Sequence, residues 1–212
     1  KKTLVHLAAL LENFRDLQGH GLKGEVGGDF AAALRHKNEV VNGIRENFPV
    51  WLKRLGVRVY IGAARIVDAN TVELAPVGAA AHESRSETLH LVKDVERLST
   101  RRIIIATGSR PAELPTCPRD GERIIDSRDF MLRLDQLPKR VLCVGGGAIG
   151  VELGYVMRQF GAEVRIIDKG DRLLDQARIP ERASAMLERK FRRIGIEVSK
   201  DLTVRSTQPS GD

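Results

Sequence analysis

The sequence predicts an α/β protein whose C-terminal half contains a parallel sheet of the Rossmann type. Two short apolar runs, residues 141–144 and 164–167, are typical of strands that are buried in such a sheet. Between them a glycine-rich turn leads into a helical pattern that ends before Gly161. An acid, Asp168, follows the second run. The order strand, glycine turn, helix, strand and acid predicts one βαβ unit.

The glycines of this turn have separate physical roles. Gly145 lets the chain turn sharply out of the strand, Gly147 leaves the backbone open to a close ligand, and Gly150 lets helix and strand pack closely. A pyrophosphate would then lie at the helix N-terminus, where free N–H groups and the helix dipole favour an anion. A glycine-rich turn can also serve packing alone, but with both strands, the helix and the acid in order we expect a dinucleotide site.

The acid at the end of the second strand bears on which dinucleotide is bound. Asp168 comes 18 residues after Gly150 and can accept a hydrogen bond from a ribose 2′-hydroxyl. A 2′-phosphate would be repelled by this carboxylate, so the sequence favours NAD over NADP. Lys169 and Arg172 lie close enough in the chain to soften that preference.

The first 55 residues predict two helices. Apolar residues recur at helical spacing from about residue 2 to residue 17, and a glycine-rich link follows. Asp29 is a good N-cap for a long helix that extends through Leu55. Pro49 removes one backbone donor and is expected to kink that helix or to split it in two.

From Val57 the pattern changes to short strands. Residues 57–76 predict two strands around a turn at residues 68–70, with Gly62 marking a close approach to the backbone. Residues 76–88 predict a mobile loop, and residues 89–95 a further strand. The run RRIIIATGSRP, residues 101–111, predicts a buried strand that enters a turn of small residues.

Composition excludes several classes of function. The net charge is +7 and the pI about 9.7, but the 35 basic residues are interspersed with 28 acids, so a nucleic-acid partner is not expected. We find no apolar run long enough for a membrane span and no signal peptide. Two cysteines, Cys117 and Cys143, cannot form a disulfide scaffold or a four-ligand zinc site, so no metal is expected. Cys143 is expected to be a small core residue in a cytoplasmic protein.

Three spaced motifs carry a resemblance to a known family. They are GAARIVDANTVEL from residue 62, RRIIIATGSRP from residue 101 and VGGGAIGVELG from residue 144. With them the chain resembles the flavin-dependent pyridine nucleotide disulfide oxidoreductases, the group of dihydrolipoyl dehydrogenase, glutathione reductase, mercuric reductase and soluble transhydrogenase. The resemblance implies a partial FAD-binding domain of helices and a small β-sheet over residues 1–114, and a partial NAD-binding domain over residues 115–212.

The resemblance also implies roles for single residues. Lys2 would lie against the flavin and pair with Glu152, and both are candidate catalytic residues. The alternative for Lys2 is a frayed lysine at the chain terminus. The alternative for Glu152 is an exposed acid in the first turn of a helix, where the helix dipole favours it. Ala148 stands where many relatives carry a tyrosine that covers the flavin. The residues expected to contact FAD are Ala64, Ala106, Thr107 and Gly108; their small size could instead serve only a tight strand exit. The residues expected to contact NAD are Gly145, Gly146, Gly147, Ala148, Ile149, Gly150 and Asp168. Lys2 and Glu152 would lie close to both cofactors.

By this resemblance the chain is an internal fragment of an oxidoreductase that passes hydride between NAD(H) and FAD, similar to dihydrolipoyl dehydrogenase. Its parent is expected to be a cytoplasmic homodimer acting on a small-molecule or protein-bound disulfide or dithiol. The family's redox cysteine pair is not in this sequence, so the chain as given is expected to be inactive. A soluble transhydrogenase, a glutathione-reductase-like enzyme and a non-catalytic nucleotide-binding module remain alternatives.

Overall fold

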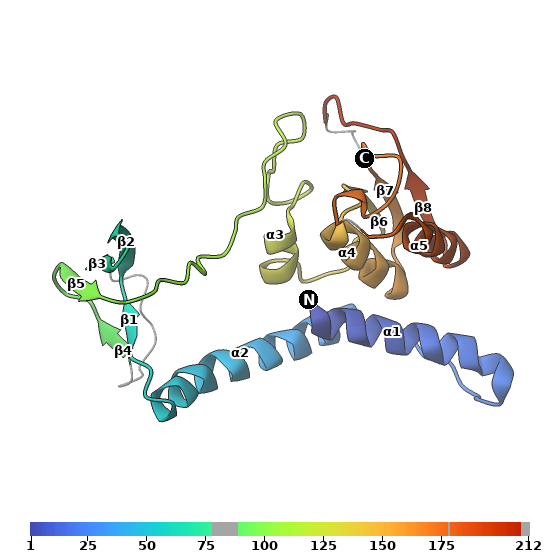
Figure 1. The fold of residues 1–212 in the computed structure, drawn as a ribbon. Coiled ribbons are helices and arrows are strands. Elements are labelled where there is room, and N and C mark those ends of the chain that lie inside the picture. The colour runs from blue at the N-terminus through green and yellow to red at the C-terminus, as the bar shows by residue number, and fades with distance from the viewer. Residues whose placement is uncertain (78–88, 178, 209–212) are drawn as a thin grey trace. The chain divides into compact units, whose positions relative to one another are not determined.

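The computed structural model describes residues 1–77, 89–177 and 179–208 (Figure 1). The chain forms two compact units, Lys1–Asn38 with Arg110–Asp212, and Glu39–Ser109. These units are defined by packing, and the expected division into domains at residue 114 stays a prediction.

The first unit contains a three-stranded parallel sheet. Its strands β6 (Arg140–Val144), β7 (Glu163–Ile167) and β8 (Ile196–Ser199) lie in that order, with Val144 paired to Ile167. Helix α4 (Ala148–Gln159) connects β6 to β7, and helix α5 (Glu181–Arg193) precedes β8 after the short 3-10 turn η3 (Asp175–Ala177). The predicted α/β class and the βαβ unit are confirmed, whereas α5 and β8 were not predicted.

The core of this unit lies between the sheet and its helices. Val164, Ile166 and Ile196 are buried on one face of the sheet. A side chain at Gly154 would come within 3.4 Å of the Cys143 Sγ atom, so a glycine allows α4 to approach the strands closely. Cys143 is the core residue that the sequence predicts, and burial raises the pKa of its thiol to about 11.

Helix α1 (Lys2–Leu17) packs against α4, as its predicted apolar stripe requires. Leu4 and Ala8 are fully buried at this contact. Beside them the buried carboxylate of Glu12 accepts hydrogen bonds from the Tyr155 hydroxyl at 2.6 Å and pairs with the Lys190 ammonium at 2.8 Å. One carboxylate thus connects α1, α4 and α5.

The charge state of Glu12 follows from these contacts. Burial opposes ionisation, but the bonds from Lys190 and Tyr155 outweigh it and hold the pKa of Glu12 below its ordinary value. A carboxyl group whose pKa is lowered by folding stabilises the fold above its ordinary pKa, and this contribution is lost as the pH falls through the folded value.

Helix α2 (Phe30–Arg54) begins as predicted. The Asp29 carboxylate accepts a hydrogen bond from the Ala32 amide at 2.9 Å, so Asp29 caps the helix. The helix runs through Pro49 without interruption, so the expectation that Pro49 could split it is wrong. Proline removes one hydrogen bond, and the bonds on either side are enough to continue the helix.

The second unit contains two small sheets. Strands β2 (Ala63–Asp68), β3 (Thr71–Ala75) and β5 (Glu96–Ser99) form an antiparallel sheet, and β1 (Val59–Ile61) pairs in parallel with β4 (Leu89–Leu91). The predicted hairpin is confirmed, the strand predicted at residues 89–95 is shorter, and β5 was not predicted. A side chain at Gly62 would meet the Ala75 carbonyl oxygen at 2.8 Å, which explains the glycine there.

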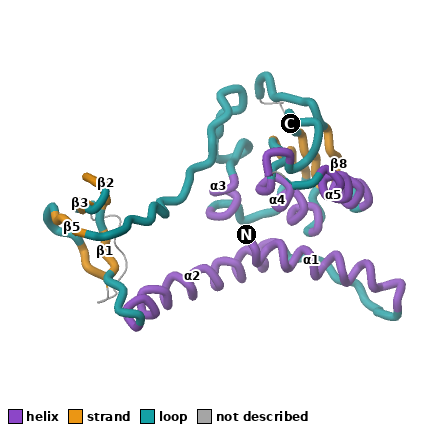
Figure 2. Tube along the Cα trace, in the orientation of Figure 1, coloured by secondary structure: helices purple, strands orange, loops and turns teal. Residues whose placement is uncertain are grey.

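The buried strand predicted at residues 101–111 is not formed. Residues 102–114 have no regular secondary structure, and Ile104 and Ile105 are 91% and 72% exposed. Figure 2 shows this segment as a loop, and the next helix along the chain is the short α3 (Ser127–Leu132). A strand needs a neighbour for its backbone, and none of the described strands pairs with this run. Residues 78–88 of the predicted mobile loop lie outside the described residues.

We predict that Tyr155→Phe lowers the free energy of unfolding. The substitution removes the buried hydrogen bond to a charged partner, Glu12, which costs about 1.5–3 kcal/mol. Urea titration followed by circular dichroism measures this loss. Tyr60→Phe is the control, because the Tyr60 ring packs edge to face on His90, and its effect should stay below about 0.5 kcal/mol. Equal stability of Tyr155→Phe and the wild type would contradict the role given to this bond.

Candidate dinucleotide site

The glycine turn follows directly from the end of β6. Gly145 has a φ of +109°, a conformation that residues with side chains rarely adopt. Its amide donates to the Ile167 carbonyl at 2.8 Å, which continues the pairing of β6 with β7 into the turn. Gly147 is the N-cap residue of α4. The chain therefore leaves the sheet and enters the helix within three residues.

Three glycines of this turn have different surroundings. A Cβ atom at Gly150 would lie 2.0 Å from the Gly145 carbonyl oxygen, so any side chain there would push the helix off the turn. A Cβ atom at Gly146 would lie 2.6 Å from the side chain of Leu173. Gly147 has nothing within 4 Å of this position. Packing accounts for two of the glycines, and the third faces open space.

The carboxylate of Asp168 faces the glycine turn. Its Oδ2 atom accepts a hydrogen bond from the Gly146 amide at 2.5 Å, and its Oδ1 atom accepts one from the Gly170 amide at 2.7 Å. The register that pairs Val144 with Ile167 brings the end of β7 beside the turn. A carboxylate has about four acceptor sites, so each oxygen retains capacity for a further donor.

The N-terminus of α4 adds a region of positive potential next to this carboxylate. Gly147, Ala148 and Ile149 are exposed, and the cap residue has no side chain to bond the first amides of the helix. The first N–H groups of a helix have no partner within it, and the dipole makes this end positive. The arrangement can hold the negative charge of a phosphate group beside a hydroxyl acceptor.

The two basic residues that follow Asp168 differ in their contacts. The Arg172 guanidinium pairs with Asp175, with 2.8 Å between Nε and Oδ1, and also donates to the Ile179 carbonyl. Lys169 is exposed. Arg172 is therefore already engaged, and only Lys169 of this pair extends into solvent.

The predicted pair between Lys2 and Glu152 is corrected by the structure. The Lys1 ammonium, 2.5 Å from the Glu152 Oε2 atom, makes this ion pair, and Lys2 is exposed. Lys1 is the N-cap residue of α1 and Lys2 its first residue, and it is the side chain of the cap residue that reaches α4. The partner expected for Glu152 was Lys2, one residue away from the lysine that makes the contact.

The residues expected to meet FAD lie in the other unit. Ala64 is an exposed residue of β2, where it pairs with Leu74. Ala106, Thr107 and Gly108 are exposed in the irregular segment at residues 102–114, where Gly108 has a φ of +76°. Their contact with FAD stays a prediction.

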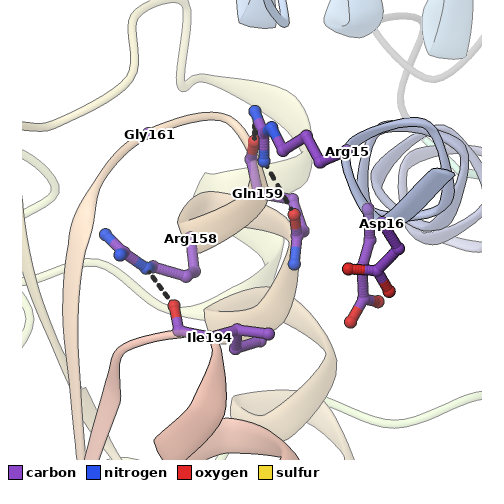
Figure 3. A pocket seen from close by; sticks show the side chains of 7 residues that line it. Arg15, Asp16, Arg158, Gln159, Gly161 and Ile194 are labelled. Atoms are coloured by element: carbon purple, nitrogen blue, oxygen red, sulfur yellow. Dashed lines mark hydrogen bonds between the residues drawn. The ribbon is translucent and has the colours of Figure 1, made fainter. Parts of the chain in front are cut away.

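A polar hollow of about 350 Å³ lies where α1 meets the end of α4, far along that helix from the glycine turn. Figure 3 shows how its walls bond to one another: Arg15 donates to the side chain and carbonyl of Gln159, and Arg158 donates to the Ile194 carbonyl. Because these donors are used within the protein, we regard the hollow as part of the contact between helices. The hollow is lined by Glu12, Arg15, Asp16, Arg158, Gln159, Gly161 and Ile194.

Among the residues that the structure describes, no group of three or more histidine, cysteine, aspartate or glutamate residues could hold a metal ion. No helix in the same part of the chain is long and apolar enough to cross a membrane.

Sequence reasoning missed one part of the site, the segment after Asp168. Leu173 is fully buried against Gly146, and the Leu174 amide donates to the Gly146 carbonyl at 2.9 Å. The signal was the apolar pair within DRLL, which stands out in an otherwise charged stretch.

Comparisons with known proteins agree with this geometry. A family model described as pyridine nucleotide-disulphide oxidoreductase matches residues 4–212. Dihydrolipoyl dehydrogenase 2 of Haloarcula marismortui is 32% identical over 82% of this chain, and dihydrolipoyl dehydrogenase of Geobacillus stearothermophilus is 29% identical over the whole chain. The matched parts make up 34% and 41% of those relatives, so this chain spans well under half of their length.

Solved structures show the same fold. LpdA from Mycobacterium tuberculosis superposes with a TM-score of 0.77 at 21% identity, over 99% of this chain and 43% of that one. The HOCl-induced flavoprotein disulfide reductase RclA from Escherichia coli has a TM-score of 0.67 at 22% identity, over 97% of this chain and 39% of that one. At these identities the likeness concerns the fold alone.

Because Gly147 and Gly150 have different surroundings, we predict that substituting them has different effects. Gly147→Val places a branched side chain in the open space, so it should abolish NADH binding while unfolding stays cooperative. Gly150→Ala should instead lower the free energy of unfolding, by about 1–3 kcal/mol as for other overpacked sites, because its Cβ atom meets the backbone. NADH fluorescence titration and thermal unfolding separate the two effects. Retained NADH affinity in Gly147→Val would show that this turn is not the phosphate site.

Proposed function

The chain belongs to the pyridine nucleotide-disulphide oxidoreductases, and on that premise we propose that residues 140–168 bind NAD(H) in a flavoprotein that passes hydride between NAD(H) and FAD. The proposed parent enzyme is similar to dihydrolipoyl dehydrogenase. One observation carries the proposal: the Asp168 carboxylate meets the Gly146 amide next to open space at Gly147.

The residues of the turn fit a dinucleotide. The space at Gly147, which a Cβ atom would enter, leaves room for a pyrophosphate against the backbone, and the start of α4 supplies N–H donors. Asp168 would accept a hydrogen bond from the adenosine ribose. When bound, the nicotinamide of NAD(H) supplies the hydride chemistry. This chain's own residues bind and orient the dinucleotide, which is the part of catalysis that positioning provides.

We also propose NAD rather than NADP as the dinucleotide. A 2′-phosphate would be placed near the Asp168 carboxylate, and the guanidinium that could offset this repulsion, Arg172, is paired with Asp175. Among the described residues of this loop, Lys169 is the other cation and is exposed, and a lysine ammonium gives less specific phosphate binding than a planar guanidinium.

Family membership implies FAD as the second cofactor, and we propose that Ala64 and residues 106–108 contact it. All four residues are exposed, which leaves them accessible to a bound cofactor. The disulfide or dithiol substrate, the cytoplasmic location and the homodimer of the parent protein are likewise proposals, because the chain spans well under half of its relatives.

A nucleotide-binding module without flavin is the second candidate, because the observation that carries the proposal, the Asp168 contact beside the open space at Gly147, concerns the dinucleotide alone. Purified chain incubated with FAD and desalted distinguishes the two. A retained flavin absorbance together with NADH-dependent dye reduction supports the flavoprotein. NADH binding without retained flavin supports the module, and the absence of NADH binding removes both.

Asp168→Ala should weaken NADH and relatively favour NADPH. Loss of a hydrogen bond between a ribose hydroxyl and a carboxylate costs about 1.5–3 kcal/mol, roughly 10- to 150-fold in affinity. Fluorescence titration with both dinucleotides measures the ratio. Asp171→Ala, in the same loop, is the matched control and should leave that ratio nearly unchanged. An unaltered NADH affinity in Asp168→Ala would place the ribose elsewhere.

A further inference from the structure

Leu174 has a backbone conformation that is unusual for its residue type. Its φ is +59°, in the left-handed region where a residue with a branched side chain is strained. Such strain persists only where the surrounding structure imposes it, and it often marks a functional constraint. The Leu174 amide donates to the Gly146 carbonyl at 2.9 Å, so the strained residue contacts the glycine turn directly.

Both backbone hydrogen-bonding groups of Gly146 are therefore held by residues that follow β7. Asp168 accepts from its amide at 2.5 Å, and Leu174 donates to its carbonyl at 2.9 Å. With the two sides of this residue fixed, its peptide groups have little freedom to rotate. The next residue is Gly147, which lies beside the open space, so these two bonds fix the backbone that leads into it.

The Leu173–Leu174 segment is in turn held by α5. The Ser184 hydroxyl, 1% exposed, donates to the Leu173 carbonyl at 2.7 Å. The Leu173 amide donates to Glu188 Oε1 at 3.3 Å, and the Leu173 side chain is completely buried against Gly146. Contacts therefore run without a gap from α5 through Leu173 and Leu174 to Gly146.

We propose that α5 positions the glycine turn for the dinucleotide through the Leu173–Leu174 segment, and that Ser184 and Glu188 are positioning residues for this site. The inference rests on the proposed function, because it takes the ligand to be NAD(H). Neither residue reaches the open space at Gly147; each acts on the turn through Leu173.

The test measures NADH affinity of the 212-residue chain by fluorescence titration, at a temperature well below the unfolding midpoint of each variant. Ser184→Ala removes only the hydroxyl that bonds Leu173. We expect NADH to bind roughly three- to tenfold more weakly, the effect of losing one hydrogen bond. Lys200→Ala is the matched control. It removes the ion pair between Lys200 Nζ and Glu188 Oε2, which are 3.2 Å apart, but keeps the Glu188 Oε1 atom that accepts from the Leu173 amide. The NADH affinity of this variant should therefore not change.

Glu188 provides a second pair of variants, which decides the matter if Ser184→Ala does not fold. Glu188→Gln keeps a side-chain carbonyl oxygen for the Leu173 amide and should retain NADH affinity, whereas Glu188→Ala should lose a similar factor to Ser184→Ala. Amide NMR signals of Gly146 and Leu174 should shift in the two weakened variants and stay in place in Glu188→Gln. A purely structural role of α5 would lower the unfolding midpoint without this pattern.

The outcomes separate the two proposals. If the wild type does not bind NADH, the proposed function fails and this inference fails with it. If the wild type binds NADH, and Ser184→Ala and Glu188→Ala bind it equally well, the positioning role is overturned while the proposed function stands.

Discussion

The hydrogen bond between the Asp168 carboxylate and the Gly146 amide is the contact on which the candidate site depends. It connects the ends of two neighbouring parallel strands, and it can form because the register pairs Val144 with Ile167. A slip of that register would move Asp168 away from the turn and turn its side chain to the other face of the sheet. Strand pairing, which is a property of the fold, therefore determines the chemistry at the site.

The glycines around this contact show that one residue type can answer different physical demands. Gly145 adopts a conformation that needs the absence of a side chain, and Gly150 lies where a side chain would strike the backbone. At Gly147 the protein itself makes no such demand, because the space there is open. Neither conformation nor packing requires glycine at this position, and the open space beside the backbone is what the proposed pyrophosphate site needs.

The sequence predicted what depends on local pattern, and it failed where distant contacts decide. The βαβ unit, α1, α2 and the β2–β3 hairpin have short-range signals and are confirmed. The apolar run at residues 103–105 has the composition of a buried strand, but composition does not supply a pairing partner. The choice between Lys1 and Lys2 depends on the rotation of α1 against α4, and the contacts of Leu173 depend on α5; neither is encoded in local spacing.

The burial of Cys143 has a practical consequence. Its thiol packs against the core, and burial raises its pKa to about 11, so at neutral pH almost none of it is the reactive thiolate. A thiol-directed fluorophore, which reacts with the thiolate, would therefore label Cys143 slowly as long as the unit with the parallel sheet stays folded.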